Sequence, residues 1–182
     1  GLCGFAFRTA DRAKAREGFA RCGRASAEDG AFDAKATHGL PITLTERALP
    51  RGAVSPFALD HIVIRTPNPE RAVALYGGRL GLDMRLDRSN PAWNARLMFF
   101  RCGDTVVEIA HVLSDGVSDA PDRFGGLSWR VPEIEAENSR LAAEGFEMSP
   151  VRNGRRPGSK VCTVRNRTAG VPTILLGVTP RP

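Results

Sequence analysis

The chain of 182 residues has few of the side chains and none of the motifs on which several common functions depend. It has a single tyrosine, four cysteines and no apolar run near the roughly 18 to 20 residues that span a membrane. Because a basic region and an apolar stretch are missing at the N-terminus, we expect no signal peptide. The motifs G-x-S-x-G, Walker A, G-x-G-x-x-G and H-E-x-x-H are also missing, so serine hydrolysis, P-loop chemistry and a Rossmann site have no support.

The cysteines are isolated along the chain. Cys3, Cys22, Cys102 and Cys162 form no C-x-x-C pair and no dense framework. Their spacing makes a zinc site built from cysteine improbable, and reduced structural thiols in a cytoplasmic protein are the expected state.

The net charge of +6 comes almost entirely from arginine, since the chain has only three lysines. The densest basic stretch comprises Arg152, Arg155, Arg156, Lys160, Arg165 and Arg167. A nucleic-acid surface would combine a basic stripe with interleaved aromatic residues, which this stretch lacks, so we do not expect a nucleic-acid partner. The stretch is either a solvated basic loop or a rim that attracts anions.

One short pattern occurs three times. Gly4–Thr9, His61–Thr66 and Gly126–Val131 read G-F-A-F-R-T, H-I-V-I-R-T and G-L-S-W-R-V, and each is followed by a helix-like stretch. Internal repetition of this kind predicts an architecture of repeated β-then-α units.

The middle copy is the most complete. Leu59–Thr66 alternates like a strand, Asn68 and Pro69 fit the N-cap and first position of a helix, and Glu70–Leu80 has helical periodicity. Three further strands are expected at Asp83–Asp87, Arg96–Arg101 and Thr105–Ala110. The unit is therefore β-α-β-β-β.

The other two copies follow the same order less completely. The third predicts strands at Leu127–Val131, Phe146–Met148, Val161–Val164 and Pro172–Val178, with a helix at Glu133–Glu144. The first predicts strands at Gly4–Thr9 and Pro41–Thr45 and a helix at Asp11–Arg21. The expected organisation is a partial module over 1–50, a linker over 51–57, a full module over 58–112, a linker over 113–124 and a second full module over 125–180.

Strand alternation assigns the residues of each repeat to two faces. Ile62 and Ile64 should pack against the helices, whereas His61, Val63 and Arg65 lie on the smaller and more polar face. A sheet covered by helices on one face only tends to curl around a ligand on the other.

The β-α-β-β-β pair resembles the vicinal oxygen chelate superfamily, the group that contains glyoxalase I, extradiol dioxygenases and fosfomycin- and bleomycin-resistance proteins. Leu59–Leu82 and Gly103–Ile109 carry the resemblance, with weaker support from Val131–Glu147, and it covers about two thirds of the chain. It implies an α+β fold in which paired modules form a curved, cup-like mixed sheet with helices on the outer face.

The resemblance also implies a divalent metal held by a His on the first strand and a Glu on the last strand of a module. His61 and Glu108 occupy these positions in the middle copy, and Glu108 is the expected catalytic residue. The third copy has Gly126 and Leu175 in the corresponding places, so the sister module lacks both ligands. Two protein ligands make a weak site for Zn²⁺, Mn²⁺, Ni²⁺ or Fe²⁺.

Further metal ligands would have to come from elsewhere. His38 and Glu46 in the first copy are weaker candidates, which require that copy to pack over the mouth of the cup or to join another chain. His111 lies three residues beyond Glu108, and alternation turns it to the opposite face.

Several residues are candidates for substrate binding. Arg65 and Arg130 repeat at one strand position beside Ser128 and could hold a carboxylate or phosphate, although rim arginines that only solvate a strand end look the same. Met98 and Phe100 alternate on one strand and predict an apolar wall of the cup, with core packing as the alternative.

The leading hypothesis is a glyoxalase-like lyase or isomerase that acts on a small anionic, oxygen-bearing molecule. A dioxygenase is less favoured because the second His is missing at the matching position. The alternative is a non-catalytic binding or resistance protein of the same fold, although a basic chain suits the cationic drug bleomycin poorly. Such modules close a cup in pairs, so the unpaired first copy predicts either a homodimer or a longer parent protein.

Overall fold

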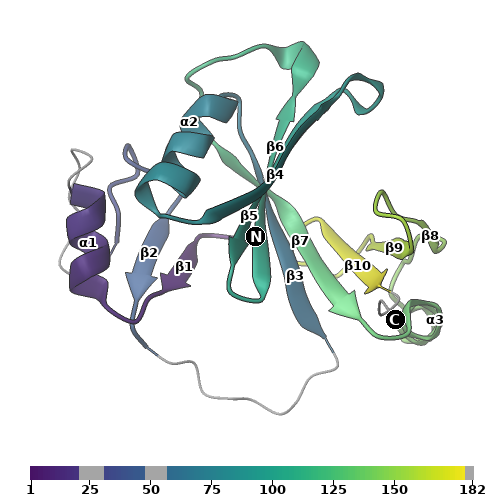
Figure 1. Ribbon diagram of the computed structural model, residues 1–182. Coiled ribbons are helices and arrows are strands. Elements are labelled where there is room, and N and C mark those ends of the chain that lie inside the picture. Colours follow the sequence, from purple (N-terminus) through teal and green to yellow (C-terminus); the bar gives the residue numbers. More distant parts are fainter. Residues whose placement is uncertain (21–30, 48–56, 179–182) are drawn as a thin grey trace.

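The computed structural model describes residues 1–20, 31–47 and 57–178, and its strands form two sheets (Figure 1). The strands are β1 (Phe5–Arg8), β2 (Ile42–Thr45), β3 (Ala58–Arg65), β4 (Asp83–Asn90), β5 (Ala95–Cys102), β6 (Thr105–Val112), β7 (Arg123–Val131), β8 (Arg152–Asn153), β9 (Ser159–Val164) and β10 (Thr173–Val178). The α-helices are α1 (Arg12–Ala20), α2 (Pro69–Val73) and α3 (Ile134–Ala143), with a π-helical turn η1 (Ala74–Arg79) and 3₁₀ turns η2 (Pro91–Trp93) and η3 (Leu113–Asp115).

The large sheet consists of two modules joined edge to edge, in the order β4-β5-β6-β3-β7-β10-β9-β8. The joining strands β3 and β7 are antiparallel, whereas the first and last strands of each module are parallel, as β3 with β6 and β7 with β10. The helix α2 packs on β6, and α3 packs on β9 and β10. The predicted fold class, paired β-α-β-β-β modules in an α+β mixed sheet, is confirmed.

The sheet curves so far that side chains at its two ends meet. Trp93 lies in η2, between β4 and β5 at one end of the strand order, and Arg155 follows β8 at the other end. The guanidinium carbon of Arg155 lies 4.8 Å from the centroid of the Trp93 ring. The eight strands therefore form a cup, with α2 and α3 on its outer face (Figure 1).

The first helix of the middle module begins as its sequence predicts. The side chain of Asn68 accepts a hydrogen bond from the backbone N–H of Arg71, and Pro69 occupies the first helical turn. The helix continues as η1, which buries Leu75 and Tyr76 completely against the sheet. The expected helix over Glu70–Leu80 is therefore present, with a π-helical second half.

The first copy forms a separate two-stranded parallel sheet with the register of the third copy. Phe5 lies opposite Ile42 as Leu127 lies opposite Thr173, and the preceding proline carbonyls accept from the N–H of Phe5 and of Leu127 at 3.1 and 2.8 Å. A Cβ at Gly4 or Gly126 would collide with the carbonyl oxygen of that proline, Pro41 or Pro172. The two copies share a backbone crossing that only glycine permits.

This small sheet packs on the outer side of the first full module. Its buried residues Phe7 and Ile42 belong to the same apolar core as Ile64, Leu75 and Phe100. The partial module therefore completes the core under α2 and does not cover the mouth of the cup. A second, smaller core lies under α3 around Ile134.

Some boundaries differ from the sequence prediction. Phe146–Met148 is not a strand, since Met148 makes only an isolated bridge to Val164, and the short edge strand is Arg152–Asn153. The strand β7 begins at Arg123, inside the expected linker over 113–124. The end of the expected helix at residue 21 and all of the linker over 51–57 except Phe57 lie outside the described residues.

Candidate functional site

A bulge in β3 brings two polar side chains to one place. Leu59 lies opposite Trp129 and His61 lies opposite Ser128, so Asp60 has no partner on β7. Regular alternation would direct Asp60 to the face opposite His61, but a bulge re-aims the inserted side chain. The carboxylate of Asp60 consequently lies beside the His61 ring.

Four charged or polar side chains form a chain of contacts on the inner face of the cup. The imidazole of His61 donates from Nδ1 to Oδ2 of Asp60 at 2.8 Å, and its Nε2 lies 3.4 Å from Oε2 of Glu108. Arg130 donates from Nε and Nη2 to Oδ1 of Asp60 at 3.0 and 2.8 Å. Because an ionised carboxylate only accepts, Asp60 fixes the Nδ1–H tautomer and directs Nε2 toward Glu108.

The two carboxyl groups of this chain differ in proton affinity. Burial raises the pKa of Glu108 above its ordinary 4.5, and the electrostatic effects of His61 and Arg155 oppose this shift only in part. The hydrogen bond from His61 holds the pKa of Asp60 below its ordinary 3.8, with help from Arg130. Carboxyl groups whose surroundings separate their pKa values are typical of proton-transfer sites.

Ser128 adds a hydroxyl beside His61 on the inner face of the cup. The inner-face residues around His61 and Glu108 are called the floor of the cup below. It lies opposite His61 on β7, its side chain is completely buried, and its Oγ has no hydrogen-bond partner. A buried polar atom without a partner is costly, and such atoms are found where a ligand or water completes the bonding. The predicted position of Ser128 at the site is supported by this geometry.

The walls of the cup are apolar. Cross-strand partners share a face, so Phe99 opposite Glu108 and Leu97 opposite Ala110 line one wall. On the other wall Ile174 lies opposite Ser128. The predicted wall residues Met98 and Phe100 lie on the reverse face instead, fully buried in the core with Tyr76. Their assignment to substrate binding does not fit this placement.

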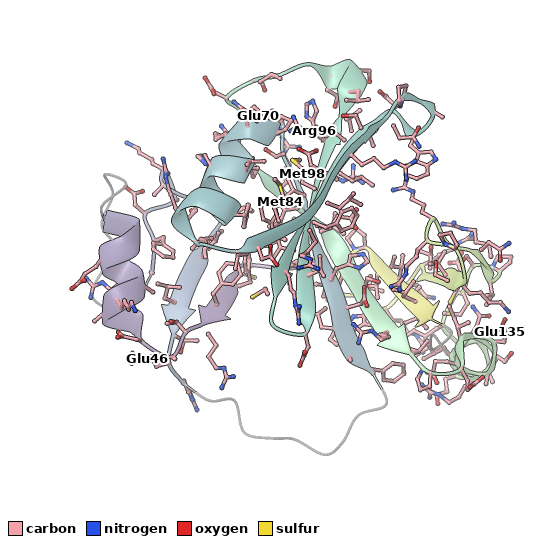
Figure 2. All side chains as sticks on the ribbon, viewed as in Figure 1. Glu46, Glu70, Met84, Arg96, Met98 and Glu135 are labelled. Carbon is pink, nitrogen blue, oxygen red and sulfur yellow. The ribbon has the colours of Figure 1, made fainter. Side chains whose placement is uncertain are left out.

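Figure 2 places Met98 on the side of the sheet that faces α2, near Arg96 and Glu70. Arg96 forms ion pairs there with Asp87 at 2.7 Å and with Glu70 at 2.5 Å. The alternation of this strand was expected correctly, but its phase was off by one residue, so the side chains next to the predicted ones face the cup.

The two predicted arginines have different surroundings. Arg130 binds Asp60 through Nε and Nη2, so most of its guanidinium holds the carboxylate that orients the His61 ring. Arg65 is exposed on the inner face, where it lies opposite Ala110 and Arg123. Of the two, Arg65 keeps the predicted capacity to attract an anion.

The weaker metal candidates lie away from this cluster. The backbone carbonyl of His38 accepts from the N–H of Asp122 at 2.8 Å on the outer side, where burial and the charges of Arg71 and Arg79 lower the pKa of His38. Glu46 lies at the end of the two-stranded sheet (Figure 2). The structure thus does not bring His38 or Glu46 to the cup.

His111 also lies outside the cup, as its position predicts. Its ring is buried on the reverse face, where Nδ1 lies 3.0 Å from the carbonyl oxygen of Thr66.

The donor set at the cup floor suits a divalent ion only in part. His61 Nε2 and Glu108 are an imidazole and a carboxylate, the donors that Zn²⁺, Mn²⁺ and Fe²⁺ accept, and Asp60 orients the ring as carboxylates orient metal-binding histidines. Asp60 lies on the other nitrogen of that ring and cannot reach the same ion. Residues 1–20, 31–47 and 57–178 contain no group of three or more His, Cys, Asp or Glu side chains placed to hold a metal.

The sister module cannot complete the set. A side chain at Gly126 would meet the carbonyl of Pro172, and the neighbour of Ser128 on β10 is Ile174. Leu175, the expected counterpart of Glu108, is turned into the second core. His61 and Glu108 therefore offer two protein ligands.

The fold, the strand order and the His–Glu pair point to one family, and a family model agrees. The model described as the glyoxalase/bleomycin resistance protein/dioxygenase superfamily matches residues 60–163, and the chain belongs to that superfamily. No curated protein matches the sequence.

Solved structures share the fold. A hypothetical protein from Bacillus halodurans is similar with a TM-score of 0.61 and 20% identity, over 70% of this chain and 99% of that one. Methylmalonyl-CoA epimerase from Mycobacterium tuberculosis is similar with a TM-score of 0.57 and 19% identity, over 73% of this chain and 94% of that one. A Streptomyces coelicolor methylmalonyl-CoA epimerase in complex with 2-nitronate-propionyl-CoA has a TM-score of 0.55 and 14% identity, over 67% of this chain and 97% of that one. Enzymes thus occur among the proteins that share this fold.

The residue of this cluster that the sequence did not indicate is Asp60. It precedes His61 directly, but the sequence contains no signal for the bulge that turns it inward.

No described helix is both long and apolar enough to span a membrane.

Proposed function

We propose that the protein is a glyoxalase-like enzyme of the lyase or isomerase type that moves a proton on a small, anionic, oxygen-bearing substrate. The observation that carries the proposal is the Asp60–His61–Glu108 chain, in which a carboxyl of raised pKa faces an oriented imidazole at the floor of an apolar cup.

Glu108 would act as the proton-transfer group. Its raised pKa brings the carboxyl closer to the working pH, which favours removing a proton from a carbon next to a carbonyl and returning it. The C–H bond breaks, the proton goes to a carboxylate oxygen of Glu108, and the electron pair moves to the carbonyl oxygen. Glu108 then donates the proton back. His61 Nε2 lies 3.4 Å away and would stabilise either protonation state.

Ser128 and Arg65 would hold the substrate. The free hydroxyl of Ser128 is placed to bond an oxygen of the substrate, and Arg65 is an exposed cation on the same face. If a divalent metal is held, His61 and Glu108 would be its protein ligands, and it would polarise two neighbouring substrate oxygens as a Lewis acid.

Solvent deuterium exchange tests the proposal. Purified protein is incubated in D₂O with methylmalonyl-CoA, on which the similar epimerases act, and with a panel of small 2-oxo and 2-hydroxy acids, and loss of the C–H signal is followed by NMR. We expect exchange with at least one compound, and a loss of roughly 10²- to 10⁴-fold in Glu108→Gln. Glu70→Gln, on α2 at the outer face, is the matched control and should keep the exchange rate.

The second candidate is a non-catalytic binder that uses the same cup. Ligand binding without exchange, and unchanged by Glu108→Gln, would favour it. Metal analysis after soaking with Zn²⁺, Mn²⁺, Ni²⁺ and Fe²⁺ adds a second criterion, since stoichiometric metal that is lost in His61→Ala favours the enzyme.

A homodimer and a cytoplasmic location remain predictions. Light scattering that shows a strict monomer would contradict the homodimer.

A further inference from the structure

The mouth of the cup is crossed by a cationic and aromatic cluster, which consists of Trp93, Arg155 and Arg88. Trp93 projects from the β4–β5 turn and is 38% exposed. The guanidinium carbons of Arg155 and Arg88 lie 4.8 and 5.5 Å from the centroid of its ring. One tryptophan thus holds two positive charges where the opposite ends of the sheet meet.

Three residues of the basic stretch that contains Arg155 are engaged, since Arg167 donates to the carbonyl oxygen of Glu144 and two others form ion pairs. Arg155 is one of the remaining three, and its guanidinium lies over the Trp93 ring. Lys160 pairs with Glu135 and Arg165 with Glu147, whereas no ion pair or hydrogen bond engages the Arg155 guanidinium anywhere in the described ranges. A guanidinium that lies over a ring uses its flat face, so its N–H edge stays available for a planar oxyanion.

The charge of Arg155 also acts on Glu108 at the floor of the cup. This charge is close enough to Glu108 to lower the pKa of that carboxyl and oppose the effect of burial. An anion bound at Arg155 would therefore lie within the same electrostatic environment as the Asp60–His61–Glu108 chain. The apolar wall that contains Leu97 and Phe99 belongs to β5, next to the turn that presents Trp93.

We propose that Arg155, positioned by the ring of Trp93, binds a carboxylate of the substrate at the mouth of the cup while the rest of the molecule reaches the floor. This inference rests on the proposed function and specifies its substrate class as small molecules with a free carboxylate. A carboxylate is favoured over a phosphate dianion because a second negative charge near Glu108 adds repulsion. Trp93 is the positioning residue and Arg155 the binding residue.

The test measures binding rather than turnover. Racemic lactate is titrated into the protein by saturation-transfer NMR, with lactamide as the neutral match and inorganic phosphate as the competing oxyanion. We expect lactate to bind, lactamide to bind at least tenfold more weakly, and phosphate to displace lactate poorly. Arg155→Gln should lower the affinity for lactate at least tenfold, since a charge-assisted bidentate contact is lost.

The matched control is Arg156→Gln, the next residue in the same exposed turn, which should change the affinity less than twofold. Trp93→Ala should weaken binding several-fold, and Trp93→Phe, which keeps a ring under the guanidinium, should restore most of it. Equal losses in the Arg155 and Arg156 variants, equal affinity for lactamide, tighter binding of phosphate or no binding of lactate would each overturn the proposal.

The two proposals can fail separately. If Glu108→Gln leaves deuterium exchange intact but Arg155→Gln weakens lactate, the carboxylate site stands and the proton-transfer role of Glu108 fails. If exchange depends on Glu108 but lactate binds equally well to the Arg155→Gln and wild-type proteins, the proton-transfer role of Glu108 stands and the carboxylate site fails.

Discussion

At the scale of single residues, the site depends on how two carboxyl groups are placed around one imidazole. Asp60 is hydrogen-bonded and charged, whereas Glu108 is buried and holds its proton more strongly than a free glutamate. Both groups also affect the free energy of unfolding, because any pKa that differs between the folded and unfolded chain makes stability depend on pH.

Glu108→Gln should make the protein more stable relative to wild type as the pH rises. The pKa of Glu108 is higher in the folded state than its ordinary 4.5, so the folded wild type binds the proton more tightly and loses stability as the pH rises from 4.5 through the raised pKa. The glutamine variant lacks this loss. Urea unfolding of both proteins across this range measures the difference.

Asp60→Asn serves as the comparison of opposite sign. The pKa of Asp60 is lowered in the folded state, so its stabilisation is present above 3.8 and disappears as the pH falls through the lowered pKa. The asparagine variant should be less stable than wild type at neutral pH, and the gap should close in acid. If the stability of both variants relative to wild type rose with pH, or fell with pH in both, the assignment of the two carboxyl groups would be contradicted.

At the scale of secondary-structure elements, strand crossings decide which positions can carry a side chain. Gly126 has φ +146 and faces the carbonyl of Pro172, and Gly4 faces the carbonyl of Pro41 at a similarly short distance. The sister positions of His61 are therefore occupied by backbone of the neighbouring strand.

Gly126→Ala should destabilise the protein by about 1 to 3 kcal/mol, since the added Cβ meets a backbone oxygen and takes an unfavourable φ. Gly78→Ala is the matched control, because no atom lies within 4 Å of its added Cβ and alanine favours helical structure over glycine. Chemical denaturation should show a loss for Gly126→Ala and no loss for Gly78→Ala. An equally stable Gly126→Ala protein would show that the crossing is loose.

The elements themselves were largely predictable, because hydrophobic period and capping residues are local signals. The strand at Ala58–Arg65 and the helix that Asn68 caps are examples. The inward turn of Asp60 was not predictable, since a bulge depends on the partner strand. The phase of β5 was also missed, because Leu97 to Phe100 are all apolar and alternation has no polar residue there to fix it.

At the scale of the whole molecule, the N-terminal sheet is part of the main core rather than an appendage. Phe7, Leu40 and Ile42 are buried together with residues of the first full module. Both tryptophans, Trp93 and Trp129, lie in the large sheet or its turns, so their fluorescence measures the unfolding of the large sheet and not of the N-terminal sheet.

Ile42→Ala should lower the free energy of unfolding by about 2 to 5 kcal/mol, because a side chain that is 1% exposed is lost from the shared core. The tryptophan fluorescence transition should shift by the full amount, although neither tryptophan is in the mutated sheet. A transition detected by fluorescence that keeps its midpoint, while circular dichroism reveals an earlier step, would show that the N-terminal sheet unfolds on its own.

The paired crossings at Gly4 with Pro41 and at Gly126 with Pro172 also restrict the mutational paths open to this protein. A single substitution at position 126 cannot add a histidine ligand while the residue before β10 stays in place. The strand end would have to withdraw first, and that change brings no ligand by itself. Descendants of this chain are therefore expected to change their ligand preference through residues of the walls and the mouth of the cup, where one substitution can add a new side chain. The floor of the cup is expected to stay the same.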